Sequence, residues 1–379
     1  MAALRDEAGG LLDRGLVLWF PGPASATGED LAELHLHGGR AVVAAVEAAL
    51  ARRPGLRRAE PGEFTRRAFA NGRIDLAQAE GLADLLDAET ELHRAAALAA
   101  AGGALSRRVE GWRARVVELS AALEAAFDFA DENDVGGLPP GFAAAVGALA
   151  SELDEALRAP AAECLRDGFR VAVAGPPNAG KSTLFNALVE SEAAIATPLA
   201  GTTRDVLERP VALGGVPFTL VDMAGLHSGG ADPVERIGIA RAHAEIARAD
   251  LVLWLGPHGE APAGAWDIEA QADVPGHAAK RAPRHRLSAV TGEGMGALRR
   301  ELAAHARDAL PKPGQPAFNR RQRERLGEAH AALIAAAGEP ELIVAEHLRL
   351  ARVAFDRLTG RATTEDVLDA LFARFCIGK

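Results

Sequence analysis

The sequence predicts a multi-domain protein of the α/β and α classes, in which an α/β domain is inserted into a helical bundle and a small α+β domain precedes both. Residues 169–183 read as an apolar strand, a glycine-rich loop and the first turn of an apolar helix. Apolar residues recur at helical spacing before this segment, at 105–130, and after it, at 319–375. Because both flanks are helical, insertion into one bundle is the simplest arrangement.

We expect four segments along the chain. Its 379 residues, 49% of them hydrophobic, suffice for two or three domains with cores of their own. The expected segments are an N-terminal α+β domain at 1–72, a first helical part at 73–167, the α/β domain at 168–305 and a second helical part at 306–379.

Composition narrows the classes of protein to consider. A net charge of −10 argues against a protein that coats a nucleic-acid backbone, although one basic patch remains compatible with it. The two cysteines, Cys164 and Cys376, lie far apart and in no metal-ligand spacing, which fits a reduced compartment. The first twenty residues mix charged and apolar side chains, and no uncharged run reaches membrane-spanning length. We expect a soluble cytoplasmic protein.

Two patterns in the first segment each allow two interpretations. His35 and His37 alternate with apolar residues on a predicted strand, so they are either metal ligands or ordinary strand histidines. No third ligand with suitable spacing accompanies them, and the second interpretation is favoured. The arginines at 52–53 and 57–58 form either a solvated face, which we favour, or an RNA-binding site.

The helical segments carry start and packing signals. Asp75 and Gln78 have the spacing of a capping box, in which each side chain bonds the backbone N–H of the other residue. Between 105 and 130 the apolar residues alternate by three and four, which predicts a packing seam that includes Trp112. We interpret Trp112 as a core residue rather than a cofactor platform.

The glycine-rich loop has a defined chemical motif. Gly175–Ser182 reads G-x-x-x-x-G-K-S between a strand and a helix, which is the context that a phosphate-binding loop requires. Its backbone N–H groups and the helix N-terminus attract phosphate oxygens. Lys181 would reach the β- and γ-phosphates, and the hydroxyl of Ser182 would ligate Mg²⁺. The alternative, a chance glycine turn before a helix, is disfavoured by the matching flanks.

Two further motifs follow in the order typical of GTPases. Gly201–Asp205 supplies a threonine, Thr203, that would complete the Mg²⁺ shell and sense the γ-phosphate. Asp222–Gly225 closes a strand as D-x-x-G, where the aspartate holds a water of the metal and the glycine N–H touches the γ-phosphate. The residues expected to bind GTP around these motifs are Asn178, Ala179, Gly180, Lys181, Ser182, Thr183, Thr197, Pro198, Leu199, Ala200, Gly201, Thr202, Thr203, Asp222, Met223, Ala224 and Gly225.

The base-recognition motif is incomplete. Where GTPases carry N-K-x-D, this chain reads Ala270-Gln-Ala-Asp273, so the base-reading carboxylate of Asp273 remains and the asparagine and lysine are lost. Ser288 and Ala289, the usual backbone readers of the guanine carbonyl, are present. We expect guanine to be preferred with reduced affinity. Only 256–265 joins two neighbouring strands, which is short for a crossover helix, so this edge of the domain should be trimmed.

The hydrolytic group is not the usual one. Leu226 follows D-x-x-G in place of the glutamine that positions water in Ras-like enzymes. Asn178 could instead help to bind a monovalent cation near the β/γ bridge, or it could be an ordinary loop residue. The residues alone leave these alternatives open.

Five more segments carry short motifs: 234–239 (Val-Glu-Arg-Ile-Gly-Ile), 27–30 (Thr-Gly-Glu-Asp), 61–65 (Pro-Gly-Glu-Phe-Thr), 75–80 and the terminal 375–379 (Phe-Cys-Ile-Gly-Lys). Together with the motifs above, they resemble the MnmE (TrmE) family of tRNA-modifying GTPases over nearly the whole chain. The resemblance implies a homodimer with an N-terminal folate-binding domain, a helical domain and an inserted Ras-like G domain. It implies K⁺-stimulated GTP hydrolysis. It also implies that, in a heterotetramer with the FAD protein MnmG, the chain forms a carboxymethylaminomethyl-type group on C5 of the wobble uridine of certain tRNAs.

The resemblance also assigns residue roles. Glu235 would orient the attacking water through a second water, whereas the residues alone favour a helix-start carboxylate. Lys181 and Thr203 would complete the catalytic set, and Ser182 with Thr203 would ligate Mg²⁺. Cys376 is either a buried small hydrophobe or a participant in the modification. The implied K⁺ cage is Asn178, Thr197, Leu199 and Thr202, and the implied folate contacts are Glu33, Arg73 (in place of an expected lysine) and Lys379.

The chain departs from the family at its start. It begins inside the family's first domain, without an opening strand, a glycine-rich motif and a folate-contacting arginine. This predicts either a misassigned start or a damaged folate site and a weaker constitutive dimer. Two functional alternatives remain: a GTP-dependent switch or assembly protein acting on ribosomes or RNA, and a degenerate nucleotide-binding scaffold. The folate-like motifs and the terminal tail favour the tRNA-modifying enzyme.

Overall fold

The structure is a computed structural model that describes residues 1–128, 138–190, 207–223, 244–276, 279–312, 317–362 and 365–375. The chain divides into two compact units, which we describe separately. The first contains 1–83, 100–149 and 328–379, and the second contains 84–99 and 150–327.

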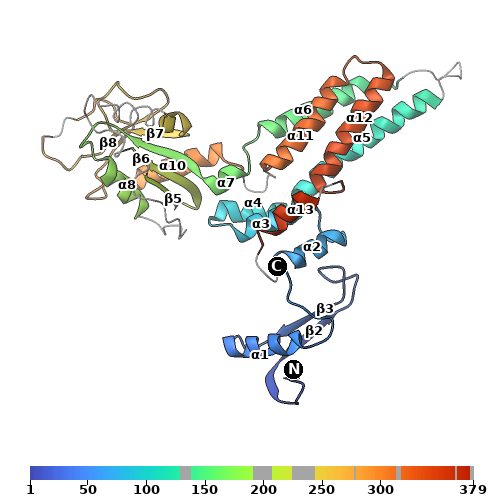
Figure 1. The fold of residues 1–379 in the computed structure, drawn as a ribbon. Helices are drawn as coiled ribbons and strands as arrows, with labels where there is room; N and C mark the ends of the chain where they lie inside the picture. The colour runs from blue at the N-terminus through green and yellow to red at the C-terminus, as the bar shows by residue number, and fades with distance from the viewer. Residues whose placement is uncertain are drawn as a thin grey trace, which may run out of the picture. The chain divides into compact units, whose positions relative to one another are not determined.

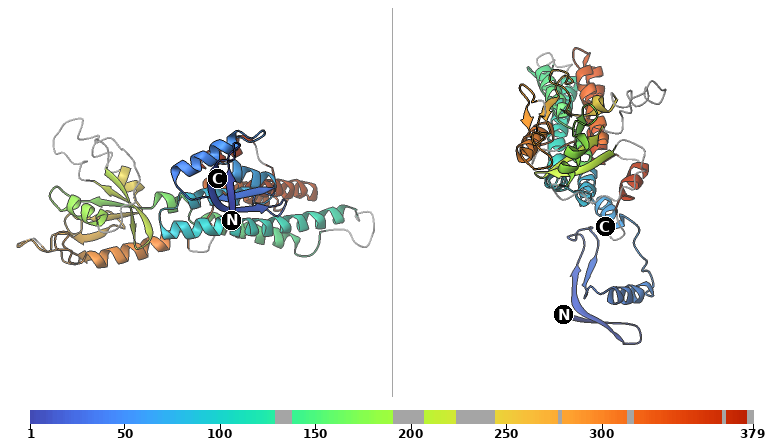
Figure 2. Two further views of the ribbon diagram at one scale, coloured as in Figure 1. Left: turned by 90° about the horizontal axis from the view of Figure 1, so that it is seen from below. Right: turned by 90° about the vertical axis from the view of Figure 1, so that its left-hand side faces the viewer.

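The first unit begins with a three-stranded antiparallel sheet in the order β1-β2-β3 (Figures 1 and 2). The strands are β1 (Ala2–Arg5), β2 (Leu11–Phe20) and β3 (Leu31–His35), and α1 (Arg40–Ala51) packs against β2. The apolar run at 15–20 forms the second half of β2. Sequence analysis does not predict β1. Its four residues, one of them a charged Arg5, carry too short an apolar pattern to stand out.

The helical part of this unit contains a packing seam between α5 (Ala104–Asp128) and α12 (Glu341–Thr359). Trp112 is buried and stacks on Phe355 with ring centroids 6.3 Å apart, which confirms its interpretation as a core residue. Arg113 donates to Asp356 across the same seam at 2.7 Å. Because α5 precedes the α/β domain and α12 follows it, this pairing confirms that the α/β domain is inserted between helical segments.

The shorter helices are α2 (Glu63–Ala70), α3 (Leu76–Leu86), α4 (Glu91–Ala101), α6 (Phe142–Arg158), α11 (Arg320–Ala335) and α13 (Glu365–Phe372). Most of α4, and parts of α3, α6 and α11, belong to the second unit. The predicted capping box is confirmed, since Asp75 N donates to Gln78 at 3.0 Å and Gln78 N donates to Asp75 at 2.8 Å. Gly360 ends α12 in the left-handed region, as expected of a helix stop.

The second unit contains a six-stranded sheet in the order β5-β6-β4-β7-β8-β9, in which only the β5–β6 pair is antiparallel (Figure 1). A turn at 214–215 joins the two strands of that antiparallel pair. The elements are α7 (Glu163–Asp167), β4 (Phe169–Ala174), α8 (Lys181–Val189), β5 (Leu207–Leu213), β6 (Val216–Asp222), β7 (Leu251–Trp254), β8 (Trp266–Glu269), β9 (His285–Arg286) and α10 (Met295–Ala309).

The main core of this unit lies on one face of the sheet. Val171 and Val173 of β4 point toward it, and α8 and α10 supply Leu184, Leu188 and Leu302. Leu92 of α4 joins the same core, although sequence analysis gave no separate helix there. The opposite face carries small residues of β4 and a second, smaller cluster, against which Ile246 and Ala249 pack.

The predicted trimming of one sheet edge is confirmed. No helix forms at 255–265 between β7 and β8, nor in the described part of 270–284 between β8 and β9. Lys280 from the second loop instead reaches Trp254 O at 3.2 Å and forms an ion pair with Asp267. His258 from the first loop bonds the other oxygen of Asp267 at 2.7 Å. Hydrogen bonds to Asp267 therefore hold together the two loops that stand in place of crossover helices.

We predict an acid-sensitive contact at the start of α2. Arg57 and Arg67 donate to Glu63 at 2.8 and 2.9 Å, and the hydrogen bond from Arg57 is the largest cause that lowers the pKa of Glu63 to about 2. A carboxyl group whose pKa is lowered by folding stabilises the fold at pH values above its pKa in the unfolded chain. This stabilisation is lost as the pH falls toward 2, the pKa in the folded protein. Glu63→Gln should therefore cost roughly 1 kcal/mol at pH 7 and little at pH 2. Urea unfolding at both pH values measures the difference.

The matched control for this change is Glu47→Gln, which removes an exposed partner of Arg58 elsewhere on the same unit. Its cost should be small at both pH values, because exposed ion pairs contribute little. An equal loss at pH 2 and pH 7 for Glu63→Gln would contradict the assignment to its charge.

Candidate nucleotide-binding site

The P-loop connects the carboxyl end of β4 to α8. Gly175 has φ +151, and a Cβ there would lie 3.0 Å from the backbone nitrogen of Gly256, so only glycine allows this approach to the end of β7. Asn178 has φ +62 and is the one non-glycine residue with positive φ among the described residues. Its place in the left-handed region fits an asparagine and turns the loop toward the N-terminus of α8.

Lys181 is folded back onto the loop that precedes it. Its Nζ donates to the carbonyl oxygens of Gly175 at 2.8 Å and Pro176 at 2.7 Å, and the residue is buried. Burial lowers the pKa of Lys181 below its usual value, and the nearby Asp222 carboxylate opposes that shift. The ammonium is thus held at the mouth of the loop, where incoming phosphate oxygens would compete with the two carbonyls.

Ser182 and Asp222 meet beside this lysine. Asp222 ends β6 and pairs in register with Val173 of β4, so both strand ends lie at the same edge of the sheet. The hydroxyl of Ser182 donates to Asp222 Oδ2 at 3.1 Å. A hydroxyl and a carboxylate placed next to a phosphate-binding loop are hard oxygen ligands of the kind that Mg²⁺ takes together with phosphate oxygens. The residues present therefore fit Mg²⁺.

The predicted base-reading loops lie next to each other. Gln271 and Ser288 form an antiparallel bridge, and Ala272 N donates to Leu287 O at 3.1 Å. Ser288 is fully buried, and its Oγ accepts from Thr291 N at 3.0 Å, which holds the loop closed. Asp273 is exposed on the adjacent loop, where its carboxylate is open to a ligand.

Gln271 is a contact that sequence analysis missed. Its Nε2 donates to the carbonyl oxygen of Asn178 at 3.1 Å, and its Cγ would lie 3.5 Å from a Cβ placed on Gly180. The side chain therefore joins the base-reading loop to the P-loop. Its place in the sequence is the signal that could have identified this residue. Gln271 stands where N-K-x-D has its lysine, and it keeps a long side chain with a hydrogen-bond donor.

The other predicted site residues are placed as follows. Ala179 packs partly buried against the main core, Met223 is buried, Thr183 is exposed and Ala289 is half-buried. Twelve predicted residues lie outside the described ranges: Thr197, Pro198, Leu199, Ala200, Gly201, Thr202, Thr203, Ala224, Gly225, Glu235, Cys376 and Lys379.

The two predicted folate contacts in the described part are both exposed, in the first unit. Glu33 bonds His35 at 3.1 Å on β3. Arg73 lies beside the 27–30 motif, since a Cβ on Gly28 would come within 3.3 Å of its Cγ. Asn71 Nδ2 donates to Thr27 O at 2.9 Å, so the motif at 27–30 and the segment at 71–73 come together as one surface.

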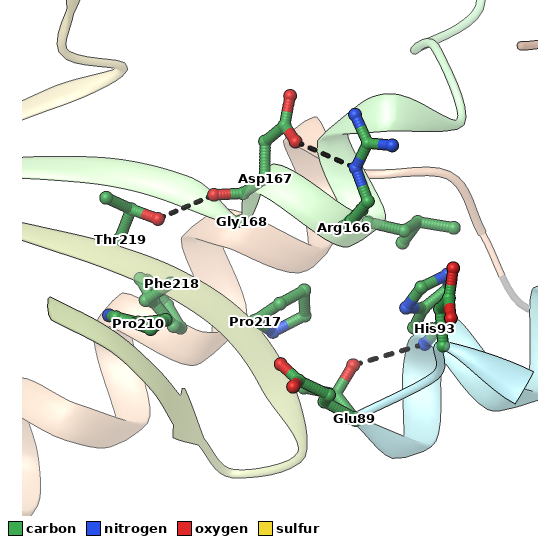
Figure 3. A pocket seen from close by; sticks show the side chains of 12 residues that line it. Glu89, His93, Arg166, Asp167, Gly168, Pro210, Pro217, Phe218 and Thr219 are labelled. Atoms are coloured by element: carbon green, nitrogen blue, oxygen red, sulfur yellow. Dashed lines mark hydrogen bonds and ion pairs between the residues drawn. The ribbon is translucent and has the colours of Figure 1, made fainter. Parts of the chain in front are cut away.

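A cavity of about 30 Å³ lies elsewhere in the second unit and contains none of the P-loop residues (Figure 3). That volume admits water but is far too small for a nucleotide or another organic ligand. His93 of α4 is buried at its wall, and desolvation lowers the pKa of this histidine while Asp84 and Asp87 oppose the shift. The residues around it are Asp87, Glu89, Thr90, His93, Leu165, Arg166, Asp167, Gly168, Pro210, Pro217, Phe218 and Thr219.

The described part of the chain contains neither a metal-binding cluster of side chains nor a membrane-spanning helix. No three His, Cys, Asp or Glu side chains gather there in a way that could hold a metal ion. No helix in those ranges has the length and apolarity needed to cross a membrane.

The fold and the site together define a P-loop protein of the GTPase class, with its α/β domain set between helical segments. Family models agree along the chain: the MnmE helical domain matches residues 76–376, and the GTP-binding protein TrmE N-terminus matches residues 1–73. The chain belongs to the MnmE family of tRNA modification GTPases.

Curated relatives span the chain. The tRNA modification GTPase MnmE of Erythrobacter litoralis is 66% identical, covering 99% of this chain and 89% of that protein. Those of Novosphingobium aromaticivorans and Rhizorhabdus wittichii are 62% and 60% identical, covering 100% of this chain and 90% and 86% of their own lengths. The G domain of the T. maritima FeoB iron transporter is 26% identical over 36% of this chain and 98% of its own. Its TM-score is 0.28, so the fold assignment rests on strand order and the P-loop.

Removing the Gln271 contact should weaken nucleotide binding. Gln271→Ala should raise the Kd for fluorescent GDP about two- to tenfold, because one hydrogen bond to the P-loop is lost. Gln271→Lys should bind at least as well as the wild type, since an ammonium can donate to the same carbonyl. Val274→Ala, an exposed change on the same loop, is the control. Unchanged affinity for Gln271→Ala would show that the contact does not support the P-loop.

Proposed function

We propose that this protein is a K⁺-stimulated GTPase that works with an MnmG-type FAD protein to form a carboxymethylaminomethyl-type group on C5 of the wobble uridine of certain tRNAs. The observation that carries the proposal is the placement of Lys181, Ser182 and Asp222 at one sheet edge in a chain of the MnmE family. The relatives are named for tRNA modification.

GTP hydrolysis is the step that the site supports. Water attacks the γ-phosphorus, the bond from that phosphorus to the β,γ-bridging oxygen breaks, and GDP and phosphate leave with a proton released. Lys181 would exchange its two carbonyl partners for β- and γ-phosphate oxygens, and it neutralises charge that develops there. Bound Mg²⁺ would supply further positive charge at the phosphates, held through Ser182 and Thr203, with Asp222 beside it.

K⁺ would supply the positive charge that other GTPases take from an arginine finger. Asn178 is the described member of the proposed cage, and its left-handed backbone places it where the loop turns. The other proposed members are Thr197, Leu199 and Thr202. Glu235 would orient the attacking water through a second water. We further propose that two copies of the chain associate as a homodimer.

The remaining parts of the proposal concern partners and location. Glu33, Arg73 and Lys379 would contact a folate of the 5-formyltetrahydrofolate type, and the surface formed by 27–30 and 71–73 supports binding in this region. Cys376 is a candidate reactive group in the modification. The protein would act in the cytoplasm, in a heterotetramer with the FAD protein and with tRNA as its substrate.

Cation dependence tests the hydrolytic part. Phosphate release from GTP should be at least about tenfold faster in KCl than in NaCl at equal ionic strength, because K⁺ replaces a charge of the size an arginine finger brings. Glu235→Ala should reduce turnover while the Kd for GDP stays near the wild-type value. Equal rates in both salts would remove the cation cage from the mechanism.

Mass spectrometry of wobble uridines tests the tRNA part. Cells that lack this gene should lose the carboxymethylaminomethyl-type nucleoside, and expression of this open reading frame should restore it. Lys181→Ala should fail to restore it, because the phosphate contact is lost. Normal modified uridine in the cells without the gene would instead favour a GTP-dependent switch or assembly role.

A further inference from the structure

Arg170 forms an ion-pair cluster on the sheet face opposite α8 and α10. It is the second residue of β4, and its neighbours Val171 and Val173 point into the main core. Side chains alternate along a strand, so Arg170 shares the other face with Ala172 and Ala174. Its side chain is 18% exposed, which is low for an arginine outside an active site.

One guanidinium nitrogen of Arg170 bonds carboxylates from two separate segments. Its Nη2 donates to Glu208 at 2.5 Å, and Glu208 is the second residue of β5. The same nitrogen donates to Glu245 in the helical segment 244–248. The side chain of Glu245 is 12% exposed. Charge-assisted bonds of this kind are among the stronger ones when water is partly excluded.

The backbone of Arg170 is itself anchored. Its N–H donates to Asp250 Oδ2 at 2.7 Å, and Asp250 N donates back to Arg170 O at 2.9 Å. Asp250 lies immediately before β7, the other parallel neighbour of β4. The guanidinium therefore projects from a point that is fixed relative to the strand leading into the P-loop.

The two carboxylates lie close in sequence to residues proposed to act on the γ-phosphate. Glu208 lies five residues after Thr203, and Glu245 lies ten residues after Glu235. Glu208 is also next to Leu207, which pairs directly with Asp222 across the β5–β6 ladder. A shift of the first residues of β5 would therefore be felt at the strand end that carries Asp222.

We propose that Arg170 is a positioning residue for GTP hydrolysis, which acts through Glu208 and Glu245 by fixing the start of β5 relative to the segment 244–248. This inference rests on the proposed function. In the described part of the chain Arg170 bonds Glu208, Glu245 and Asp250, and it lies at the end of β4 opposite the P-loop. Its effect on turnover should therefore exceed its effect on nucleotide affinity.

The charges of the cluster depend on one another. The hydrogen bond from Arg170 lowers the pKa of Glu208, and the bond to Glu208 is the largest cause that raises the pKa of Arg170. Removing the guanidinium would leave two carboxylates near each other on a partly buried face, and their repulsion would separate the segments that carry them.

A double-mutant cycle on turnover tests the proposal. Arg170→Met should lower kcat about three- to thirtyfold, the range found for residues that couple segments, while KM for GTP and the Kd for GDP change less than about threefold. Glu208→Gln, at a half-exposed carboxylate, should fold normally and lower kcat by less. The double variant Arg170→Met, Glu208→Gln should be less impaired than the product of the single effects, because the two residues act through one contact.

The matched control is Arg248→Met, since Arg248 also bonds Glu245, at 3.4 Å, but is 71% exposed. Arg248 affects Glu208 only by charge attraction, which is the weakest of the causes that lower the pKa of that carboxyl. The control variant should leave kcat near wild type. Thermal unfolding of each variant gives its midpoint temperature, and the assay is run at a temperature at which all variants are folded. Wild-type kcat in folded Arg170→Met, multiplicative effects in the cycle, or a parallel loss of GDP affinity and stability would each overturn the proposal. Absence of GTP turnover in the wild type would instead contradict the proposed function itself.

Discussion

The pairing of β4 with β6 is the constraint on which the site depends. It sets Val173 beside Asp222, so both strands end at the same edge of the sheet. The P-loop follows β4 there, and the D-x-x-G motif begins at Asp222, the last residue of β6. Ser182 and Asp222 meet only because of this register. A slip of one residue would turn every side chain of the strand to the other face and remove both the core contacts and the hydroxyl–carboxylate bond.

Sequence patterns with local causes were predicted well. The P-loop could be located because glycines, lysine and serine occur at fixed spacing between a strand and a helix. The capping box at Asp75 is likewise a contact between residues three apart. Each of these depends on residues that are close in the chain, so the pattern already contains the partners.

Contacts between distant segments could not be predicted in this way. Gln271 is separated from Asn178 by most of the α/β domain, and nothing in its own neighbourhood indicates that the two loops meet. Arg170 reads as an ordinary polar residue in an apolar strand, because both of its acidic partners lie much later in the chain. The loops that replace helices at the trimmed edge also depend on tertiary hydrogen bonds, such as that between His258 and Asp267.

The place of α4 has a consequence for cutting the protein into parts. Leu92 of α4 and Leu165 of α7 are buried in the same core as α8 and α10, although both precede residue 168. A fragment limited to 168–305 would therefore expose an apolar surface that these two leucines cover. Burial of a leucine stabilises a fold by about 2 kcal/mol, so such a fragment would lose stability and tend to self-associate through the bared surface. The segment 84–99 packs with the nucleotide-binding unit and covers part of its core.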